Sequence, residues 1–135
     1  VQPEKSYDTL DEMVLHVEKL LQSLQLPYRL LRLCGGDMGF ASAITYDFEV
    51  YSAAQERWLE VSSVSNFESF QANRLKCRYK DATGKTQLVH TLNGSSLALP
   101  RILACLLENN QGDEGILLPE VLHGYFGKKM VVAGN

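Results

Sequence analysis

The sequence predicts an α+β domain, built on a mainly antiparallel sheet that is flanked by helices. Short segments with a period of two follow one another at hairpin spacing, and two longer stretches with helical periodicity bracket them. There is neither a strand–helix–strand alternation nor a GxGxxG motif, so a doubly wound fold is not expected. A length of 135 residues suits one domain, and we expect residues 1–135 to form a single unit.

The N-terminal segment is predicted to be an amphipathic helix that begins near Asp8 and ends before Pro27. Its polar residues fall mostly on one side, so His16 is expected to face solvent. The apolar residues recur at intervals of three and four: Leu10, Met13, Val14, Val17, Leu20, Leu21 and Leu24.

Strands are expected over residues 28–33, 45–51, 58–64, 76–80 and 86–92, with a short helix or turn at 66–72. The spacers 53–56 and 81–85 have the composition of hairpin loops. Four basic residues alternate with apolar ones and predict a basic edge of the sheet, with binding of a nucleotide or RNA phosphate as the alternative. They are Arg74, Lys76, Arg78 and Lys80.

A second helix is predicted from Ser95 or Ser96 to about Asn109, with Pro100 in its first turn. It is apolar almost all the way round, which is typical of a buried helix, and Arg101 carries the only full charge between His90 and Glu108. A buried guanidinium left unpaired costs about 3–5 kcal/mol, so Arg101 needs an anion. Two partners fit: a phosphate at the helix N-terminus, or an Asp or Glu elsewhere in the fold. A short helix at 119–122 completes the prediction.

A second candidate site lies on the strand predicted at 58–64. Glu60, Ser62 and Ser63 offer hard oxygen ligands that suit a Mg²⁺ ion holding phosphates. Strict alternation places Glu60 and Ser62 on one face and Ser63 on the other. The alternative is a solvated outer face of the sheet, on which Glu60 binds nothing. His90 is expected to be a hydrogen-bonded structural histidine.

Composition excludes several classes. A net charge of −3 gives no general basic field for nucleic acid. Cys34, Cys77 and Cys105 lie far apart, which argues against a disulfide framework or a zinc site and for a reducing compartment. No apolar run reaches the roughly 18 residues that a membrane span needs. We therefore expect a cytoplasmic protein without a membrane segment.

Several segments, in order along nearly the whole chain, resemble seryl-tRNA synthetase, a class II aminoacyl-tRNA synthetase. They are Thr45–Val50, Glu60–Phe67, Phe70–Ala72, His90–Ser95, Pro100-Arg101, Leu107–Gln111 and Pro119–Leu122. The resemblance implies the class II catalytic fold, of which residues 1–135 would be the C-terminal part. It implies a catalytic role for Arg101 and Glu60, an ATP site made of Glu60, Val61, Ser62, Ser63 and Arg101, a Mg²⁺ site at Glu60 and Ser63, and serine binding by Ser95 and Asn93.

The implied activity is ATP-dependent activation of serine to seryl-adenylate, followed by transfer to tRNA(Ser). The family's upstream motifs and its N-terminal tRNA-binding arm have no counterpart in the sequence. The resemblance thus implies a homodimeric full-length protein that binds tRNA(Ser) through that arm, and a chain that is inactive alone. Two alternatives remain: a relative that loads an amino acid onto a carrier protein, and a truncated, non-catalytic binding module.

The sequence departs from the family pattern at three positions. Ser96 and Pro100 stand where many members have Gly, and Asn73 replaces a frequent Arg. Without upstream strands, we also expect an unpaired sheet edge and a partly exposed apolar helix face.

Overall fold

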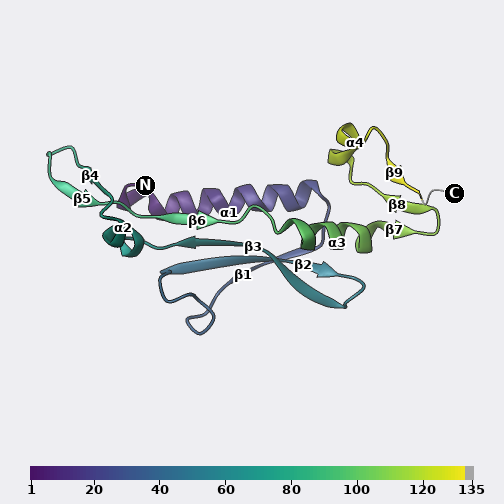
Figure 1. Ribbon diagram of the computed structural model, residues 1–135, viewed down its shortest axis with the longest axis horizontal. Helices are drawn as coiled ribbons and strands as arrows, with labels where there is room; N and C mark the ends of the chain where they lie inside the picture. Colours follow the sequence, from purple (N-terminus) through teal and green to yellow (C-terminus); the bar gives the residue numbers. More distant parts are fainter. Residues whose placement is uncertain (133–135) are drawn as a thin grey trace.

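A computed structural model describes residues 1–132, which form a four-stranded antiparallel sheet with the long helix α1 along one face (Figure 1). Helix α1 spans Ser6–Ser23 and follows a short 3₁₀ turn at Pro3–Lys5. The strand order is β1 (Tyr28–Arg32), β2 (Ile44–Ser52), β3 (Arg57–Asn66) and β6 (Leu92–Gly94). This is the predicted α+β architecture. Within the described residues, no helix is both long and apolar enough to span a membrane.

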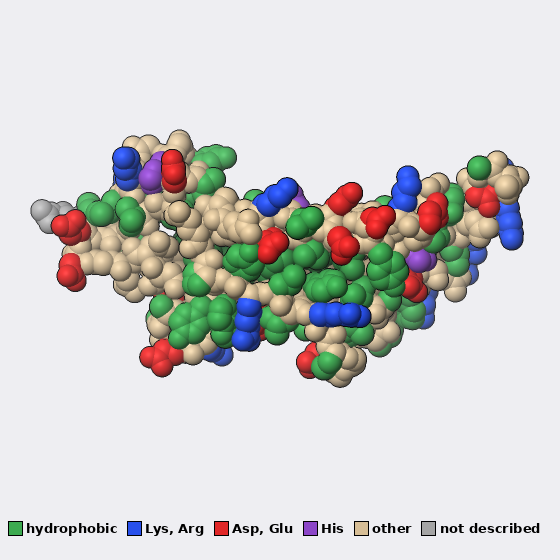
Figure 2. All heavy atoms as spheres, turned by 180° about the vertical axis from the view of Figure 1, so that it is seen from behind, with side chains coloured by type: hydrophobic (Ala, Val, Ile, Leu, Met, Phe, Trp, Pro, Cys, Tyr) green, Lys and Arg blue, Asp and Glu red, His purple; other side chains and the backbone are tan. Residues whose placement is uncertain are grey.

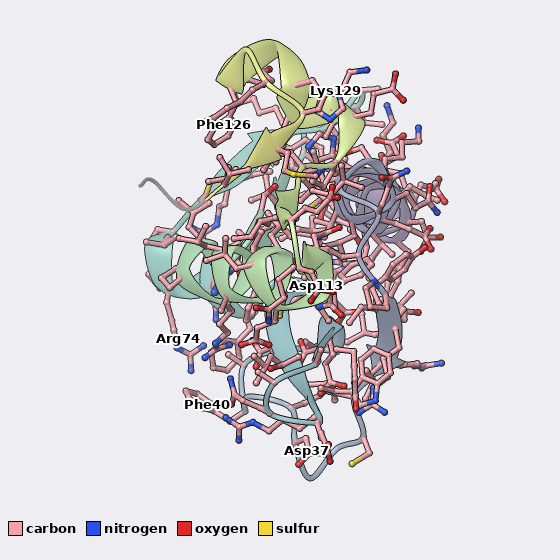
Figure 3. The ribbon with its side chains drawn as sticks, turned by 90° about the vertical axis from the view of Figure 1, so that its right-hand side faces the viewer. Asp37, Phe40, Arg74, Asp113, Phe126 and Lys129 are labelled. Atoms are coloured by element: carbon pink, nitrogen blue, oxygen red, sulfur yellow. The ribbon has the colours of Figure 1, made fainter. Side chains whose placement is uncertain are left out.

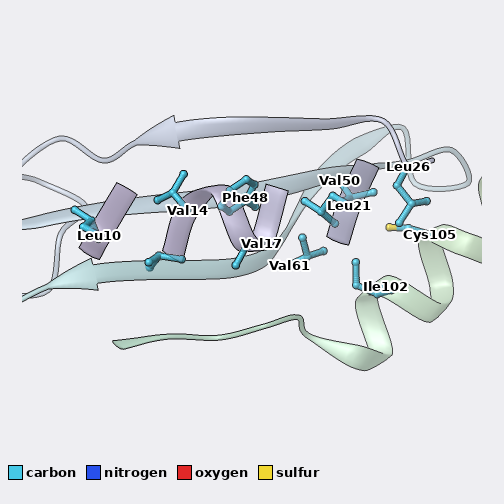
Figure 4. Packing of buried hydrophobic residues seen from close by; sticks show 11 residues of the cluster. Leu10, Val14, Val17, Leu21, Leu26, Phe48, Val50, Val61, Ile102 and Cys105 are labelled. Atoms are coloured by element: carbon cyan, nitrogen blue, oxygen red, sulfur yellow. The ribbon is translucent and has the colours of Figure 1, made fainter. Parts of the chain in front are cut away.

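The core lies between α1, the inner face of the sheet and one side of helix α3 (Leu99–Asn110) (Figure 4). Leu10, Val14, Val17 and Leu21 of α1 are buried, which confirms the predicted apolar side of this helix. The helix begins two residues before the predicted start, because Ser6 caps the preceding turn by donating its hydroxyl to the carbonyl oxygen of Pro3. His16 is exposed, as expected.

Gly94 lets α1 and β6 approach closely. A Cβ atom at this position would lie 3.2 Å from a methyl carbon of Val64 and 3.3 Å from the terminal carbon of Met13. Both distances are shorter than ordinary Cβ contacts, so a side chain here requires Val64 or the end of Met13 to move by a few tenths of an ångström. The glycine therefore allows close packing of β6 against α1.

Helix α3 begins at Leu99 and not at the predicted Ser95 or Ser96. The intervening residues follow the edge of β3: the Ser95 amide donates to the carbonyl oxygen of Ser63 at 3.0 Å, and the Ala98 amide donates to that of Val61 at 2.7 Å. These bonds keep the backbone extended past β6. The helix then begins at Leu99, with Pro100 in its first turn.

The prediction that α3 is buried on every side is wrong. Ile102 and Cys105 enter the core, whereas Leu99 and Leu103 are 74% and 58% exposed. The exposed side lines an apolar groove of about 630 Å³ together with residues of the C-terminal part, such as Leu117 and Phe126. Apolar side chains also gather at the surface in the middle of the rear face (Figure 2). The expectation of a partly exposed apolar helix face is thus confirmed.

The remaining elements are short. Helix α2 covers Phe70–Leu75, and β4 (Arg78–Lys80) pairs with β5 (Thr86–Leu88) in a separate two-stranded sheet. The prediction of longer strands at 76–80 and 86–92 within the main sheet is therefore wrong. The predicted basic sheet edge is also wrong, because Arg74 lies in α2 and Lys76 is its left-handed C-cap with φ 58°.

The C-terminal part forms a three-stranded sheet that the sequence did not predict: β7 (Gln111–Gly112), β8 (Gly115–Leu117) and β9 (Met130–Val131). Its strands are too short to show a period of two. Helix α4 (Glu120–Phe126) lies between β8 and β9, where a short helix was expected at 119–122.

Candidate functional site

A β-bulge decides which side chains of β3 share a face. Glu60 pairs with Glu49 and Ser62 pairs with Phe48, so Val61 is an extra residue without a partner on β2. Val61 and Ser62 are consequently both buried on the core side. Glu60 and Ser63, which strict alternation places on opposite faces, come to the same outer face, the sheet face that points away from α1. The prediction that Ser62 shares the face of Glu60 is wrong for this reason.

The outer face carries further carboxylates from β2. Glu49 lies opposite Glu60, and Asp47 lies opposite Ser63. Directly opposed residues of antiparallel strands have Cβ atoms about 4.5–5.5 Å apart. Oxygen Oδ1 of Asp47 is buried and has no hydrogen-bond partner among the described residues. An unpartnered carboxylate oxygen of this kind is well suited to a cation or a donor group of a ligand.

One basic side chain, Arg29, borders this acidic face. Arg29 of β1 pairs with Glu49 across the strands at 2.5 Å, and its guanidinium lies 4.7 Å from the ring centroid of Trp58. Sequence reasoning missed Asp47, Glu49 and Arg29 as site residues. The period-two pattern of residues 45–51 predicts that Asp47 and Glu49 share one face of the strand. Only the hairpin register places them beside Glu60 and Ser63.

Arg101 comes to the same place from α3. Its Nη1 atom donates a 2.5 Å hydrogen bond to the main-chain carbonyl oxygen of Glu60. The side chain is exposed, so the prediction of a buried cation is wrong, because α3 turns this part of its surface toward solvent. No acidic side chain within residues 1–132 forms an ion pair with Arg101. The two candidate segments therefore meet, and the guanidinium charge is free for an external anion.

Ser95 is held firmly beside β3. Its hydroxyl oxygen accepts a hydrogen bond from the Ser63 amide at 3.1 Å, and its carbonyl oxygen accepts one from the Ser62 hydroxyl at 2.5 Å. Asn93 lies opposite Ser65 in the β3–β6 pairing. Both Ser95 and Asn93 are exposed. The loop end thus presents small polar side chains next to the segment that carries Glu60 and Ser63.

His90 is a structural residue, as expected. Its Nδ1 atom lies 2.8 Å from the Ser6 hydroxyl, and its backbone amide donates to the Val1 carbonyl oxygen at 2.9 Å. These contacts join the start of α1 to the segment before β6.

The oxygen donors fit a magnesium ion that is shared with a polyphosphate. No group of three or more His, Cys, Asp or Glu side chains suited to a metal exists in the described part of the chain. A site made wholly of protein ligands is therefore not formed. Mg²⁺, however, is usually held by one or two carboxylates together with phosphate oxygens and water. Glu60, Ser63 and the unpartnered oxygen of Asp47 match that kind of partial site.

Comparison with known proteins relates this geometry to a family. Residues 1–110 match the core domain of the class II tRNA synthetases for G, H, P, S and T. The chain belongs to this family. Two bacterial serine–tRNA ligases are also similar to the chain in sequence. The serine–tRNA ligase of Salinibacter ruber is 60% identical over 129 residues, which cover 94% of this chain and 30% of that protein. The serine–tRNA ligase of Neisseria meningitidis serogroup B is 57% identical over 128 residues.

Solved structures of this class II family show the same fold. The seryl-tRNA synthetase of Pyrococcus horikoshii, complexed with ATP, matches with a TM-score of 0.94 and 37% identity, over 100% of this chain and 31% of that one. The cytoplasmic serine–tRNA ligase of Naegleria fowleri, in complex with AMP, matches with a TM-score of 0.89 and 33% identity, over 100% of this chain and 32% of that one. The predicted fold class and the resemblance to seryl-tRNA synthetase are confirmed. The chain spans about 30% of the length of these relatives.

Proposed function

We propose that this class II chain is the C-terminal part of the catalytic core of a serine–tRNA ligase. The parent protein would activate serine with ATP and transfer it to tRNA(Ser). One observation carries the proposal: the bulge at Val61 brings Glu60 and Ser63 to one face, and Arg101 is fastened beside them with its charge unpaired. The high structural similarity to a synthetase that was complexed with ATP supports a nucleotide on this face.

Arg101 is suited to bind phosphate oxygens. One of its N–H groups is occupied by the Glu60 carbonyl, and the rest of the planar fork remains available. The backbone contact orients the guanidinium before the ligand arrives, so little side-chain freedom is lost on binding. Glu60 and Ser63 would hold Mg²⁺, which, when bound, neutralises part of the charge of the triphosphate.

Ser95 and Asn93 are suited to recognise the serine substrate. Their exposed hydroxyl and amide groups can hydrogen-bond to a small polar amino acid, and the β3 contacts of Ser95 fix its position. In the first step, a carboxylate oxygen of serine attacks the α-phosphorus of ATP; the bond to pyrophosphate breaks, and seryl-adenylate forms. In the second, a ribose hydroxyl at the tRNA 3′ end attacks the adenylate carbonyl, loses its proton, and AMP leaves. Both steps need positioning and charge stabilisation, without a nucleophile from the protein.

The partners follow from the same proposal. The tRNA-binding arm and the homodimer contacts would lie in the rest of the parent protein. That part corresponds to the roughly 70% of the Salinibacter ruber enzyme that this chain does not cover. We also propose that the parent protein is cytoplasmic. Three cysteines that form no disulfide among themselves are consistent with it.

The decisive experiment is serine-dependent exchange of pyrophosphate into ATP, measured with the full natural polypeptide. Exchange that needs serine and Mg²⁺, and that other amino acids do not support, is the expected result. Absence of exchange with an otherwise folded protein would contradict the proposal and favour a binding module. Transfer of the activated serine is then measured with tRNA and with a carrier protein as acceptors. Loading of the carrier alone would replace the tRNA part of the proposal.

A further inference from the structure

An exposed aromatic and arginine cluster lies outside the site described above. Phe40 is 93% exposed, and its ring centroid lies 5.6 Å from that of Phe70 at an interplanar angle of 80°. The Arg74 guanidinium lies over the Phe70 ring, 3.5 Å from the centroid. Phe40 and Arg74 lie near each other on one side of the molecule (Figure 3). We call Phe40, Phe70 and Arg74 the stacking platform.

The stacking platform is ordered without being part of the core. Nη1 of Arg74 donates a 3.1 Å hydrogen bond to the Phe70 carbonyl oxygen, which helps to keep the guanidinium over the ring. Phe40 contributes little to folding, because an apolar side chain stabilises a protein only as its surface leaves water. A hollow of about 370 Å³ adjoins the platform, lined by residues 41–43 and 67–70 with Asn73 and Arg74. The platform therefore presents aromatic and guanidinium surface to solvent next to this hollow.

The segment that carries Phe70 and Arg74 is basic although the chain is acidic overall. Between residues 67 and 80 there are four basic side chains and one acidic one, Glu68, whereas the whole chain has a net charge of −3. The Glu68 carboxylate accepts a 2.7 Å hydrogen bond from the Tyr7 hydroxyl. Arg74, Lys76 and Arg78 are exposed. This local charge favours a partner with phosphate groups.

The platform adjoins the proposed serine site. The Ala43 amide, in the hollow, donates to the Asn66 carbonyl oxygen, and two residues further along β2, Thr45 pairs with Ser65, which pairs with Asn93. Two residues of a strand span about 6.6 Å, and the path from β2 across β3 to β6 adds two strand spacings of about 4.8 Å each. One extended ligand can therefore reach from the platform to the residues proposed to bind serine.

We propose that the stacking platform binds an unpaired base close to the 3′ end of the RNA acceptor. Single-stranded RNA is recognised by stacking of splayed bases on aromatic rings and arginine planes, with basic side chains on the phosphates. A double-stranded region does not suit Phe40, because its bases are already stacked on one another. This inference rests on the proposed function, in which an RNA receives the serine.

The test uses the full natural polypeptide and its tRNA. We expect Phe40→Ala to raise the KM for tRNA roughly tenfold, a typical effect of removing one stacking contact, while serine-dependent pyrophosphate exchange stays at the wild-type rate. Phe40→Tyr retains a stacking ring and should restore the KM. Arg74→Lys retains the positive charge but removes the planar guanidinium group, so it should raise the KM for tRNA as Phe40→Ala does. Tyr125→Ala removes another aromatic residue, 86% exposed on α4, and serves as the matched control.

A second readout reports stacking directly. A tRNA that carries 2-aminopurine next to its 3′ end should lose fluorescence when it binds the wild-type protein, and should keep it with Phe40→Ala. Equal KM and equal quenching in wild type and Phe40→Ala would overturn the inference. Missing pyrophosphate exchange in the wild type would instead overturn the proposed function. If Phe40→Ala impaired transfer to a carrier protein and left RNA binding unaffected, the proposal that the stacking platform binds RNA would also be overturned.

Discussion

The guanidinium of Arg101 and the main-chain carbonyl oxygen of Glu60 are joined by a 2.5 Å hydrogen bond across 41 residues of sequence. A carbonyl group orients a guanidinium without neutralising it, which a carboxylate would do. The bond also links α3 directly to the bulged part of β3. Any ligand that binds both the Arg101 fork and the oxygen ligands of β3 therefore meets groups whose relative positions are already set.

Replacing Arg101 with Ala should slow serine-dependent pyrophosphate exchange about 100-fold, because donors that stabilise developing phosphate charge have effects of this size. Steady-state exchange at saturating serine measures the effect. Arg57→Ala removes an exposed arginine of the same sheet, which donates to Gln55 only, and should leave the rate unchanged. An unaltered rate in Arg101→Ala would remove this residue from the site.

Replacing Ser95 with Ala should raise the KM for serine more than the KM for ATP. The expected increase is about tenfold, the equivalent of ~1.4 kcal/mol for one lost hydrogen bond. Both constants come from the same exchange assay. Equal changes in the two constants would show that Ser95 acts on the position of β3, through its bond with the Ser63 amide, and not on serine.

Replacing Gly94 with Val should destabilise the fold by about 1–3 kcal/mol, because the added side chain overlaps Val64 and Met13. The fall in Tm of the natural polypeptide measures this. Gly35→Ala is the matched control, since a Cβ atom at Gly35 meets nothing within 4 Å. Similar Tm values for the two variants would show that α1 can move away from β6 at little cost.

The three thiols should differ sharply in reactivity. Burial raises the pKa of Cys105, and the nearby charge of Glu108 raises it further, so this thiol stays protonated at pH 8. Cys34 and Cys77 are exposed. Titration with a thiol-specific disulfide reagent should label these two quickly and Cys105 only after denaturant is added. Fast labelling of Cys105 would indicate that α3 opens readily from the core.

Acid should loosen the hairpin formed by β4 and β5. The Asp81 carboxylate accepts bonds from the Thr83 hydroxyl, the Gln87 amide and two backbone amides, and these bonds lower its pKa below 3.8. The unfolded form thus takes up a proton more readily. The stabilisation is fully present above about pH 3.8 and is lost as the pH falls through the lowered pKa.

NMR titration of the Asp81 carboxyl and exchange of the Lys85 amide, which donates to Asp81 at 3.0 Å, would follow this change. Asp81→Asn should abolish the pH dependence of the Lys85 amide. Persistence of that dependence in the variant would assign it to another group.

Sequence periodicity was enough for α1 and for the existence of the hairpin of β2 and β3, because each buries an apolar side against the core, but it did not reveal the bulge at Val61. It was not enough for α3. This helix has apolar residues on all sides, so the sequence does not reveal which side is buried against the core. The anion partner of Arg101 stays a prediction, because it was argued from burial, whereas the side chain is exposed and bonds to a carbonyl oxygen. Asp47 required the strand register, and the stacking platform required Phe40 and Phe70, which are remote in sequence, to meet in space.

The extra residue at Val61 has a consequence for how this protein can vary. Exchange of Val61 for another aliphatic residue changes only the fit of a core side chain. Removal of the Val61 codon would leave Glu60 and Ser63 two positions apart, so regular alternation would keep both side chains on the outer face without a bulge. The three-residue spacing of Glu60 and Ser63 and the bulge between them therefore depend on each other, and a change in one requires a change in the other.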